Sequence, residues 1–306
     1  MVNKKSNENT VSYFFIIIPV ILLFIGFFFA PDILTMEMQQ ILGIPLYISL
    51  LFLIFGFVLK DDVAAGKIKI AGWMLLGFYW SVQPKTLYFG EEGDIVNAVI
   101  CGVGVFVLYY FAYHEYLSII RNEKISCLNW IAGASAIAGI IYFGIDLTPL
   151  APWLIRVVAF QSTVLLNFFT GNVTIDDVHI FYNGTYAVTI IFACTAVQSM
   201  VIFVGMILAL NKKVSFRREI LGLLVTVVPI YFLNLIRNAL IVYLIGNKIT
   251  DFSTAHNIIG KGGSLIALVI LLLIVVRIVP EVFDEIICLT DLPKRRGPIE
   301  KLLGKK

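Results

Sequence analysis

Long apolar runs, separated by short polar connections, follow one another along this chain. A helix that crosses a membrane needs about 20 mostly apolar residues. Charged residues cluster between the runs and do not form one polar face of each run, as they would on the surface helices of a soluble protein. Spans are predicted at residues 13–30, 44–59, 70–82, 95–117, 127–145, 186–210, 220–245 and 254–279. The pattern predicts an all-α polytopic membrane protein with about eight transmembrane helices.

The apolar segment at residues 150–169 allows two topologies. It is long enough to span, but it contains the polar or helix-breaking residues Pro152, Arg156, Gln161 and Asn167. If it crosses the membrane, the basic residues near 211–218 fall outside and every later loop inverts. If it is interfacial or re-entrant, all basic loops stay inside. We expect the second arrangement, with a short extracytoplasmic hairpin at about 170–184 and both termini in the cytoplasm.

The whole chain, residues 1–306, is expected to form a single integral membrane domain. Its parts are N-terminal helical spans at 13–145, an interfacial helix and outer loop at 150–184, spans with the candidate chemistry at 186–280, and a basic cytoplasmic tail at 281–306.

Composition supports the membrane assignment. Hydrophobic residues make up 59% of the chain and charged residues only 14%, and the mean hydropathy is +0.93. These values exclude an ordinary soluble domain. The net charge of +3 carries little meaning as a total, whereas the distribution of lysine and arginine sets the orientation.

The four cysteines lie in or beside apolar segments without the spacing of metal ligands, at Cys101, Cys127, Cys194 and Cys288. We therefore expect neither a disulfide framework nor a zinc site.

Cys194 stands out because hydrogen-bonding side chains surround it in the run 186–210. Thr195 follows directly, and Gln198 and Ser199 come one turn later. A thiol beside such groups suits a nucleophile. The alternative is a small buried hydrophobe beside hydroxyls that bond back to their own helix.

The span at 220–245 carries an arginine in its apolar interior. Spacing by three and four residues places Asn234, Arg237 and Asn238 on one helix face. An intramembrane arginine marks a functional site by default, because its insertion costs about 2.5–3.5 kcal/mol on the translocon scale. The alternative is an arginine that pairs structurally or snorkels outward.

Depth along the predicted helices brings three side chains together near the outer face. Cys194 lies about 12 Å below Tyr186, and Arg237 lies about 13 Å below Gly246, at 1.5 Å per residue. His256 follows at the head of the last span, where Ser253 or Thr254 can cap the helix. A thiol, a guanidinium and an imidazole form a constellation for cysteine acyl transfer.

Three other titratable sites are expected to be structural. Arg277 lies about 31 Å beyond His256 along the last helix, so we expect it near the cytoplasmic boundary. His114, beside Glu115, is expected on the surface at the inner boundary. His179, with Asp176 and Asp177 in the predicted hairpin, could bind a metal, but we expect a solvated loop. The small residues at 260–263 favour close backbone approach and form no phosphate loop, because no strand precedes them.

Three sequence motifs resemble the exosortase/archaeosortase family, most of all its archaeosortase A branch. They are the run FACTAVQS at 192–199, the run NLIRN at 234–238, and AHN at 255–257 followed by GKGGS at 260–264. The resemblance covers residues 186–280, whereas the N-terminal half agrees only as hydrophobic spans. The family often has glycine where this chain has Ala196, a departure that leaves the cysteine in place.

The resemblance implies a membrane cysteine transpeptidase without a cofactor or a metal. Its expected partners are secreted proteins, such as surface-layer glycoproteins, that carry a C-terminal sorting signal with a Pro-Gly-Phe motif, a hydrophobic helix and a basic tail. Cys194 would form an acyl-thioester and Arg237 would stabilise the thiolate or the oxyanion. His256 would move the proton, although Arg277 could claim that role, and Thr195, Gln198, Asn234 and Asn238 would support the site.

The remaining expectations concern the acceptor of the reaction and the side of the membrane on which it takes place. A membrane lipid is the expected acceptor, nucleic acid is not an expected partner, and the active site should face the extracytoplasmic side of the cell membrane. Two rival functions stay open: an intramembrane cysteine protease whose reaction ends in hydrolysis, and an anion transporter that uses Arg237. No internal repeat supports the transporter.

Overall fold

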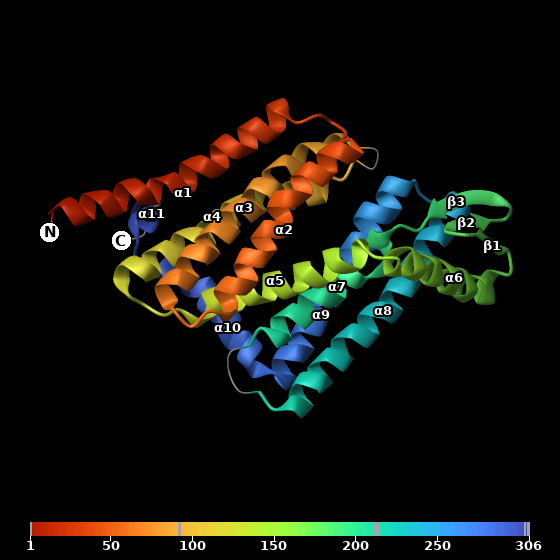
Figure 1. Cartoon of the computed structure of the whole chain (residues 1–306). Helices are drawn as coiled ribbons and strands as arrows, with labels where there is room; N and C mark the ends of the chain where they lie inside the picture. The colour runs from red at the N-terminus through yellow and green to blue at the C-terminus, as the bar shows by residue number, and fades with distance from the viewer. Residues whose placement is uncertain (1, 91–92, 211–213, 303, 305–306) are drawn as a thin grey trace. The chain divides into compact units, whose positions relative to one another are not determined.

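Helices make up most of the structure, as the apolar runs predict (Figure 1). The computed structural model describes residues 2–90, 93–210, 214–302 and 304. Two compact units are distinguished along the chain: unit 1 comprises Met1–Ala136 with Asp284–Lys306, and unit 2 comprises Ile137–Phe283. Lys212 and Lys213, on which part of the predicted topology depends, lie outside the described residues.

Seven described helices are long and apolar enough to cross a membrane, which confirms the polytopic all-α class. They are Thr10–Phe29, Glu37–Val58, Ile95–Arg121, Ser126–Asp146, Leu150–Thr170, Phe216–Gly246 and Thr254–Ile278. The run predicted at 70–82 lies within a longer helix, α3 (Asp62–Phe89), whose first turns carry Asp62, Lys67 and Lys69.

Unit 1 is built around α3. Asp61 caps this helix by accepting hydrogen bonds from the backbone N–H groups of Val63 and Ala64. On its two sides pack α2 (Met36–Val58) and α4 (Ile95–Arg121), and α1 (Val2–Phe29) contacts both α3 and α4. The first part of α5 (Ser126–Asp146) also belongs to this unit.

The C-terminal segment folds within unit 1 and is more than a basic tail. It continues from α10 (Pro280–Asp291) through a 3-10 turn at Leu292–Arg295 to the short helix α11 (Pro298–Leu302). The carboxylate of Glu300 is 2% exposed and accepts hydrogen bonds from Tyr110 Oη at 2.7 Å and Tyr113 Oη at 3.0 Å. Burying a carboxylate requires such donors, and α4 supplies them.

His114 and Glu115 are buried, so the expectation that they lie on the surface is wrong. The side chain of His114 is fully buried, with Nε2 3.4 Å from Glu300 Oε1. Glu115 pairs with Lys69 across 2.8 Å, and both side chains are under 10% exposed. The folded C-terminal segment and α3 bring the opposite charges that make burial tolerable.

Cys127 and Cys288 are joined by a disulfide in unit 1, which contradicts the expectation that the cysteines form no such bond. Their Cα atoms are 5.8 Å apart, although 161 residues separate them in the sequence. Local cysteine spacing cannot reveal a pair that only the folded C-terminal segment brings together.

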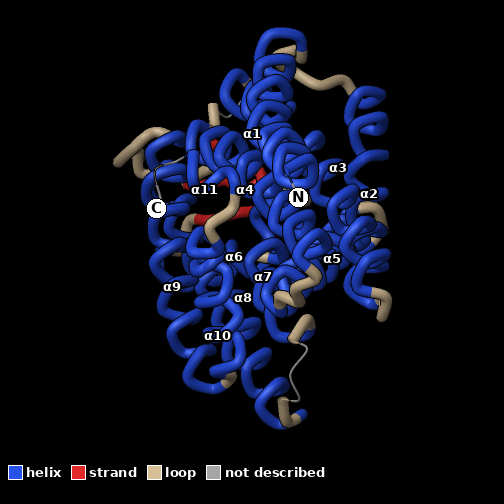
Figure 2. The backbone as a smooth tube through the Cα atoms, turned by 90° about the vertical axis from the view of Figure 1, so that its left-hand side faces the viewer, coloured by secondary structure: helices blue, strands red, loops and turns tan. Residues whose placement is uncertain are grey.

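Unit 2 contains a three-stranded antiparallel sheet among helices (Figure 2). Its strands are β1 (Val173–Asp176), β2 (His179–Tyr182) and β3 (Thr185–Thr189), in the order β1-β2-β3. Asn183 and Gly184 form the two-residue turn between β2 and β3, both with positive φ. Asn-Gly is the sequence that such tight hairpin turns favour. The predicted hairpin is thus part of a larger sheet.

The single span predicted at 186–210 is wrong. Residues up to Thr189 belong to β3, a 3-10 turn follows at Phe192–Thr195, and the helix α7 comprises only Val197–Leu208. Its 12 residues extend about 18 Å, short of the roughly 30 Å of a bilayer core. Ala187, Val188 and Ile190 are apolar because they are buried in the protein core of unit 2.

Helix α6 (Leu150–Thr170) packs against β1 and against α8 (Phe216–Gly246). Val158, Ala159 and Leu166 join the core of unit 2, and Arg156 Nε donates to Asp177 Oδ1 across 2.7 Å. The helix has the length and composition of a span. Its interfacial or re-entrant placement stays a prediction.

Candidate active site

Cys194 lies in the tight turn that connects β3 to α7. Its backbone N–H donates to Ile191 O at 2.8 Å, and the hydroxyl of Thr195 donates to Phe192 O at 2.7 Å. Both Cys194 and Thr195 are buried, at 9% and 1% exposure. Thr195 therefore stabilises the turn that presents the thiol.

Ala196, the residue that precedes α7, adopts a left-handed conformation with φ +67°. This conformation costs an L-residue with a Cβ roughly 1–2 kcal/mol, whereas glycine adopts it freely. The bend places Cys194 three residues before Val197, the first residue of α7, near a helix N-terminus that favours negative charge. The departure from glycine noted in the sequence thus falls at a position with positive φ.

Two amides from α8 hold the backbone of Cys194. The carbonyl oxygen of Cys194 accepts hydrogen bonds from Asn234 Nδ2 at 2.7 Å and from Asn238 Nδ2 at 3.1 Å. Both asparagines are buried, at 8% and 3% exposure. Because they are four residues apart on one helix, they reach the same acceptor. They fix the nucleophile candidate through its backbone and leave the thiol free of this contact.

Arg237 lies on the same helix between these amides. Its guanidinium is close enough to Cys194 for an electrostatic interaction. Its Nε is buried, and no group in the described residues accepts a hydrogen bond from it. A buried N–H without an acceptor is costly, and such groups at functional sites are often satisfied by a ligand.

Gly260 makes room for the arginine. A Cβ at this position would lie 3.0 Å from Arg237 Nε, 3.0 Å from Ile241 Cδ1 and 3.2 Å from Ala255 O. The close approach expected of the small residues at 260–263 therefore involves the side chain of Arg237.

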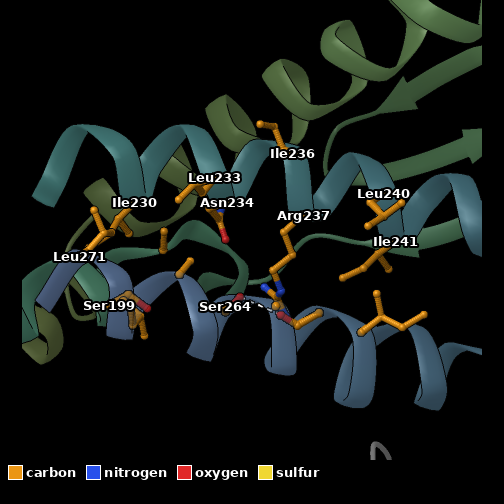
Figure 3. Close-up of a pocket in the computed structure, with 16 residues that line it drawn as sticks. Ser199, Ile230, Leu233, Asn234, Ile236, Arg237, Leu240, Ile241, Ser264 and Leu271 are labelled. Atoms are coloured by element: carbon orange, nitrogen blue, oxygen red, sulfur yellow. Dashed lines mark hydrogen bonds between the residues drawn. The ribbon is translucent and has the colours of Figure 1, made fainter. Parts of the chain in front are cut away.

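A cavity of about 190 Å³ opens between α8 and α9 (Lys261–Ile278), beside the N-terminus of α7. Figure 3 shows the side chain of Arg237 projecting from α8 toward α9 within this cavity. Asn234, Ser199 and Ser264 add polar groups to walls that are otherwise mostly apolar. The cavity thus offers one cation in apolar surroundings, next to the turn that carries Cys194.

His256 lies in a π-helical turn, Thr254–Gly260, that leads into α9. Its ring is half-buried and stacks on Phe252 with centroids 5.2 Å apart. Asp251 caps this turn by accepting from the N–H of Thr254 at 3.0 Å and from its hydroxyl at 2.7 Å, so the expected cap by Ser253 or Thr254 is wrong. The hydroxyl bond holds the pKa of the Asp251 carboxyl below its usual range.

Arg277 and Gln198 lie apart from these groups. Arg277 is exposed in the last turn of α9, which continues without a break from Lys261. Arg277 is 16 residue steps beyond Lys261, which corresponds to about 24 Å along the helix axis. Gln198 is exposed in the first turn of α7, whereas its neighbour Ser199 lines the cavity.

The aspartates and histidine of the sheet are engaged separately. His179 Nδ1 shares a hydrogen bond with Thr189 Oγ1 at 2.7 Å, while Asp177 pairs with Arg156. Among the described residues, the group of side chains that could hold a metal ion lies in unit 1 and consists of Cys127, Glu285 and Cys288.

The structure thus brings together Cys194, Asn234, Arg237 and Asn238, which the sequence predicted as a group. It adds two features that the sequence did not reveal, the left-handed Ala196 and the space that Gly260 leaves for Arg237. The glycine that begins the GKGGS run, Gly260, was the sequence signal for the space beside Arg237.

Comparison with protein families identifies the relatives of this chain. Residues 6–275 match the family model described as Transmembrane exosortase (Exosortase_EpsH). No curated protein and no solved structure matches the chain. Because the match covers most of the sequence, this multi-pass membrane protein belongs to the transmembrane exosortases, a family of membrane cysteine transpeptidases that act on protein sorting signals.

Proposed function

We propose that Cys194 is the nucleophile of a transpeptidation in which Arg237 stabilises the reacting charge. The observation that carries this proposal is the buried Arg237 Nε, which faces a cavity beside Cys194 without an acceptor among the described residues. In a low-dielectric site, a fixed donor of this kind stabilises developing negative charge far more than it would in water.

The reaction has two acyl transfers. The Cys194 thiolate attacks the scissile carbonyl, and the oxyanion of the tetrahedral intermediate is met by the guanidinium of Arg237. The amine leaves with a proton, and the acyl group remains on sulfur as a thioester. A nucleophile of the acceptor then attacks the thioester, gives up its proton, and releases the thiolate of Cys194.

His256 is proposed as the group that carries the proton. Imidazole titrates near neutral pH, whereas the guanidinium of Arg277 stays protonated and cannot act as a base. His256 lies at the head of α9, in the same π-helical turn as Gly260, and this position supports the choice. Arg277 is the rival, and its distance along an unbroken helix argues against it.

The substrates that we propose are secreted surface proteins, such as surface-layer glycoproteins, with a C-terminal signal of the archaeosortase type. The signal would comprise a Pro-Gly-Phe motif, a hydrophobic helix and a basic tail. The three motifs of the C-terminal half support this branch of the family. We place the active site at the extracytoplasmic side and propose a membrane lipid as the acceptor.

Trapping the thioester tests this function. Full-length protein in membranes is incubated with a substrate that carries the complete sorting signal, quenched in acid and analysed by mass spectrometry of the peptide containing Cys194. We expect an acyl adduct on Cys194 that hydroxylamine releases. The Cys194→Ser variant should form no thioester adduct. Cys101→Ser is the matched control and should retain the adduct.

The mass of the released product distinguishes the outcomes. A new C-terminus that carries the mass of a lipid nucleophile supports transpeptidation. A free carboxylate as the main product would show a cysteine protease, and wild-type processing by Cys194→Ala would refute the assignment of the nucleophile.

A further inference from the structure

Cys127, Glu285 and Cys288 form a buried cluster in unit 1 that the proposed reaction does not use. Cys127 is fully buried, Glu285 is 1% exposed and Cys288 is half-buried. One ligand atom from each side chain lies within 4.8 Å of the other two. Once the disulfide is reduced, two sulfurs and a carboxylate at this spacing could serve as metal ligands, even though the sequence separates them widely.

Basic residues flank the cluster in the sequence: Arg121 and Lys124 precede Cys127, and Lys294, Arg295 and Arg296 follow Cys288. Arg121 Nη1 donates to Arg295 O at 3.1 Å, Arg295 pairs with Glu123, and Lys124 pairs with Asp62. The positive-inside rule places such a concentration of lysine and arginine in the cytoplasm. Cytoplasmic thiols are kept reduced in most cells. The disulfide is the oxidised form of this pair, and the reduced form is the one expected in that compartment.

We propose that the reduced cluster binds a zinc ion through Cys127, Cys288 and Glu285. Zinc combines thiolate and carboxylate ligands, whereas magnesium and calcium select oxygen ligands alone. Ser126 Oγ donates to Glu285 Oε2 at 3.0 Å, the kind of outer contact that orients a ligating carboxylate. Water completes the tetrahedral coordination.

Conversion of the disulfide to the zinc-bound form requires only a reductant and zinc. A dithiol reductant of the cytoplasm delivers two electrons and two protons to the Cys127–Cys288 bond. The two thiols lose these protons as their thiolates bind zinc. In either form the cluster fastens α10 to the first turn of α5 and so closes the long loop between them.

Metal binding by the full-length protein tests this proposal. The detergent-solubilised chain is reduced, stripped with a chelator and titrated anaerobically with Co²⁺, a spectroscopic substitute for zinc. We expect about one Co²⁺ per chain and the near-ultraviolet absorption of a thiolate–cobalt bond. Zn²⁺ should displace the cobalt, and protein purified without the chelator should contain zinc by elemental mass spectrometry.

Variants separate the ligands from other thiols. Cys288→Ser and the isosteric Glu285→Gln should bind cobalt at least about tenfold more weakly, since even outer contacts of a metal change its affinity 10–100-fold. Cys101→Ser should bind like the parent. If Cys288→Ser does not fold, the comparison of Glu285→Gln with the parent decides.

Three results would overturn the proposal. They are a reduced parent without the thiolate–cobalt band, an unchanged affinity in Glu285→Gln, and thiol trapping in intact cells that finds Cys127 and Cys288 still bonded.

Discussion

Side chains of α8 act on Cys194 in two different ways. Asn234 and Asn238 bind its backbone carbonyl, and Arg237 interacts with its thiol. The hydrogen bonds to the carbonyl fix the position of Cys194, and the arginine stabilises negative charge on its thiolate. Substitutions on one helix can therefore distinguish how much of the reaction depends on geometry and how much on electrostatics.

Replacement of Arg237 tests the electrostatic contribution. Arg237→Ala should lower the rate of substrate processing about 10²–10³-fold, as expected when a single oxyanion donor is removed. Arg237→Lys should not restore it, because an ammonium lacks the planar guanidinium fork. Processing is measured by gel shift of a substrate protein, with immunoblotting of membranes to show normal abundance. Full activity in either variant would reduce Arg237 to a packing residue.

Replacement of the asparagines tests positioning. Asn234→Ala and Asn238→Ala should each slow processing about tenfold, because loss of one buried hydrogen bond costs about 1–3 kcal/mol. The loss should appear in kcat more than in KM. Asn247→Ala is the matched control, since its amide makes an exposed hydrogen bond to Tyr243 O at the end of the same helix. An equal loss of processing rate in Asn247→Ala would argue against a specific role of Asn234 and Asn238 at Cys194.

At the scale of elements, the π-helical turn at Thr254–Gly260 and the continuous helix α9 assign different places to the two candidates for proton transfer. His256 lies at the head of the helix and Arg277 in its last turn, about 31 Å apart if every residue advanced by the 1.5 Å of an α-helix. The wider π turn advances less per residue and shortens this distance only slightly, so the two side chains cannot both serve one carbonyl.

Alanine substitutions decide between them. His256→Ala should slow processing about 10²–10⁴-fold, the usual contribution of general acid–base catalysis. Arg277→Ala should leave the rate of substrate processing per membrane-inserted enzyme molecule unchanged. It should at most lower the amount of enzyme in the membrane. The two are compared in the same membranes with the substrate in excess. A tolerant His256→Ala beside an inactive Arg277→Ala would reverse the assignment.

Sequence patterns revealed some elements and not others for a physical reason. Helices such as α4 and α8 were predictable because their apolar length matches a membrane. Ala187, Val188 and Ile190 are as hydrophobic, but they are buried in protein, the first two in β3 and the third just after it. Apolar composition alone does not distinguish lipid from protein interior. The group of Cys194, Asn234 and Arg237 was predictable from polar residues in apolar runs. The hydrogen bond from Asn234 to the carbonyl oxygen of Cys194 can be seen only in the folded structure.

At the scale of the whole molecule, the C-terminal segment depends on protonation. Burial alone raises the pKa of Glu300, but the adjacent imidazole of His114 and the hydrogen bonds from Tyr110 and Tyr113 outweigh it and hold the pKa at about 2. The ordinary value for this carboxyl is 4.5. A carboxyl whose pKa is depressed in the folded state stabilises that state above its unfolded pKa, and this stabilisation is lost as the pH falls.

Hydrogen exchange checks this linkage. Protection of residues 298–302, corrected for the intrinsic pH dependence of exchange, should be full above about pH 4.5 and decline toward pH 2. Glu300→Gln should lower protection at neutral pH and flatten the decline. Protection that stays constant across this range in the parent would show that the carboxylate contributes nothing to docking.

Membrane orientation is the second property of the whole chain that can be measured. Asn183 lies in the β2–β3 turn and Arg217 in the first turn of α8. The distribution of basic residues predicts that they lie on opposite sides, with Asn183 outside. Single cysteines at these positions, in a background in which all four native cysteines are replaced, should react with an impermeant maleimide in whole cells only at position 183. Labelling of both would refute the predicted topology.

The handedness of Ala196 has a consequence for the chemistry of the chain itself. Its φ of +67° is a conformation that a D-amino acid prefers and an L-amino acid resists. Among the residues that a ribosome can supply, only glycine escapes this conflict of chirality. Ala196→Gly removes roughly 1–2 kcal/mol of strain but gives the unfolded chain more freedom, worth about 0.4–1 kcal/mol in the opposite direction. A D-alanine introduced by semisynthesis would keep the restriction and lose the strain, so the bend before α7 should be most stable with the mirror-image residue.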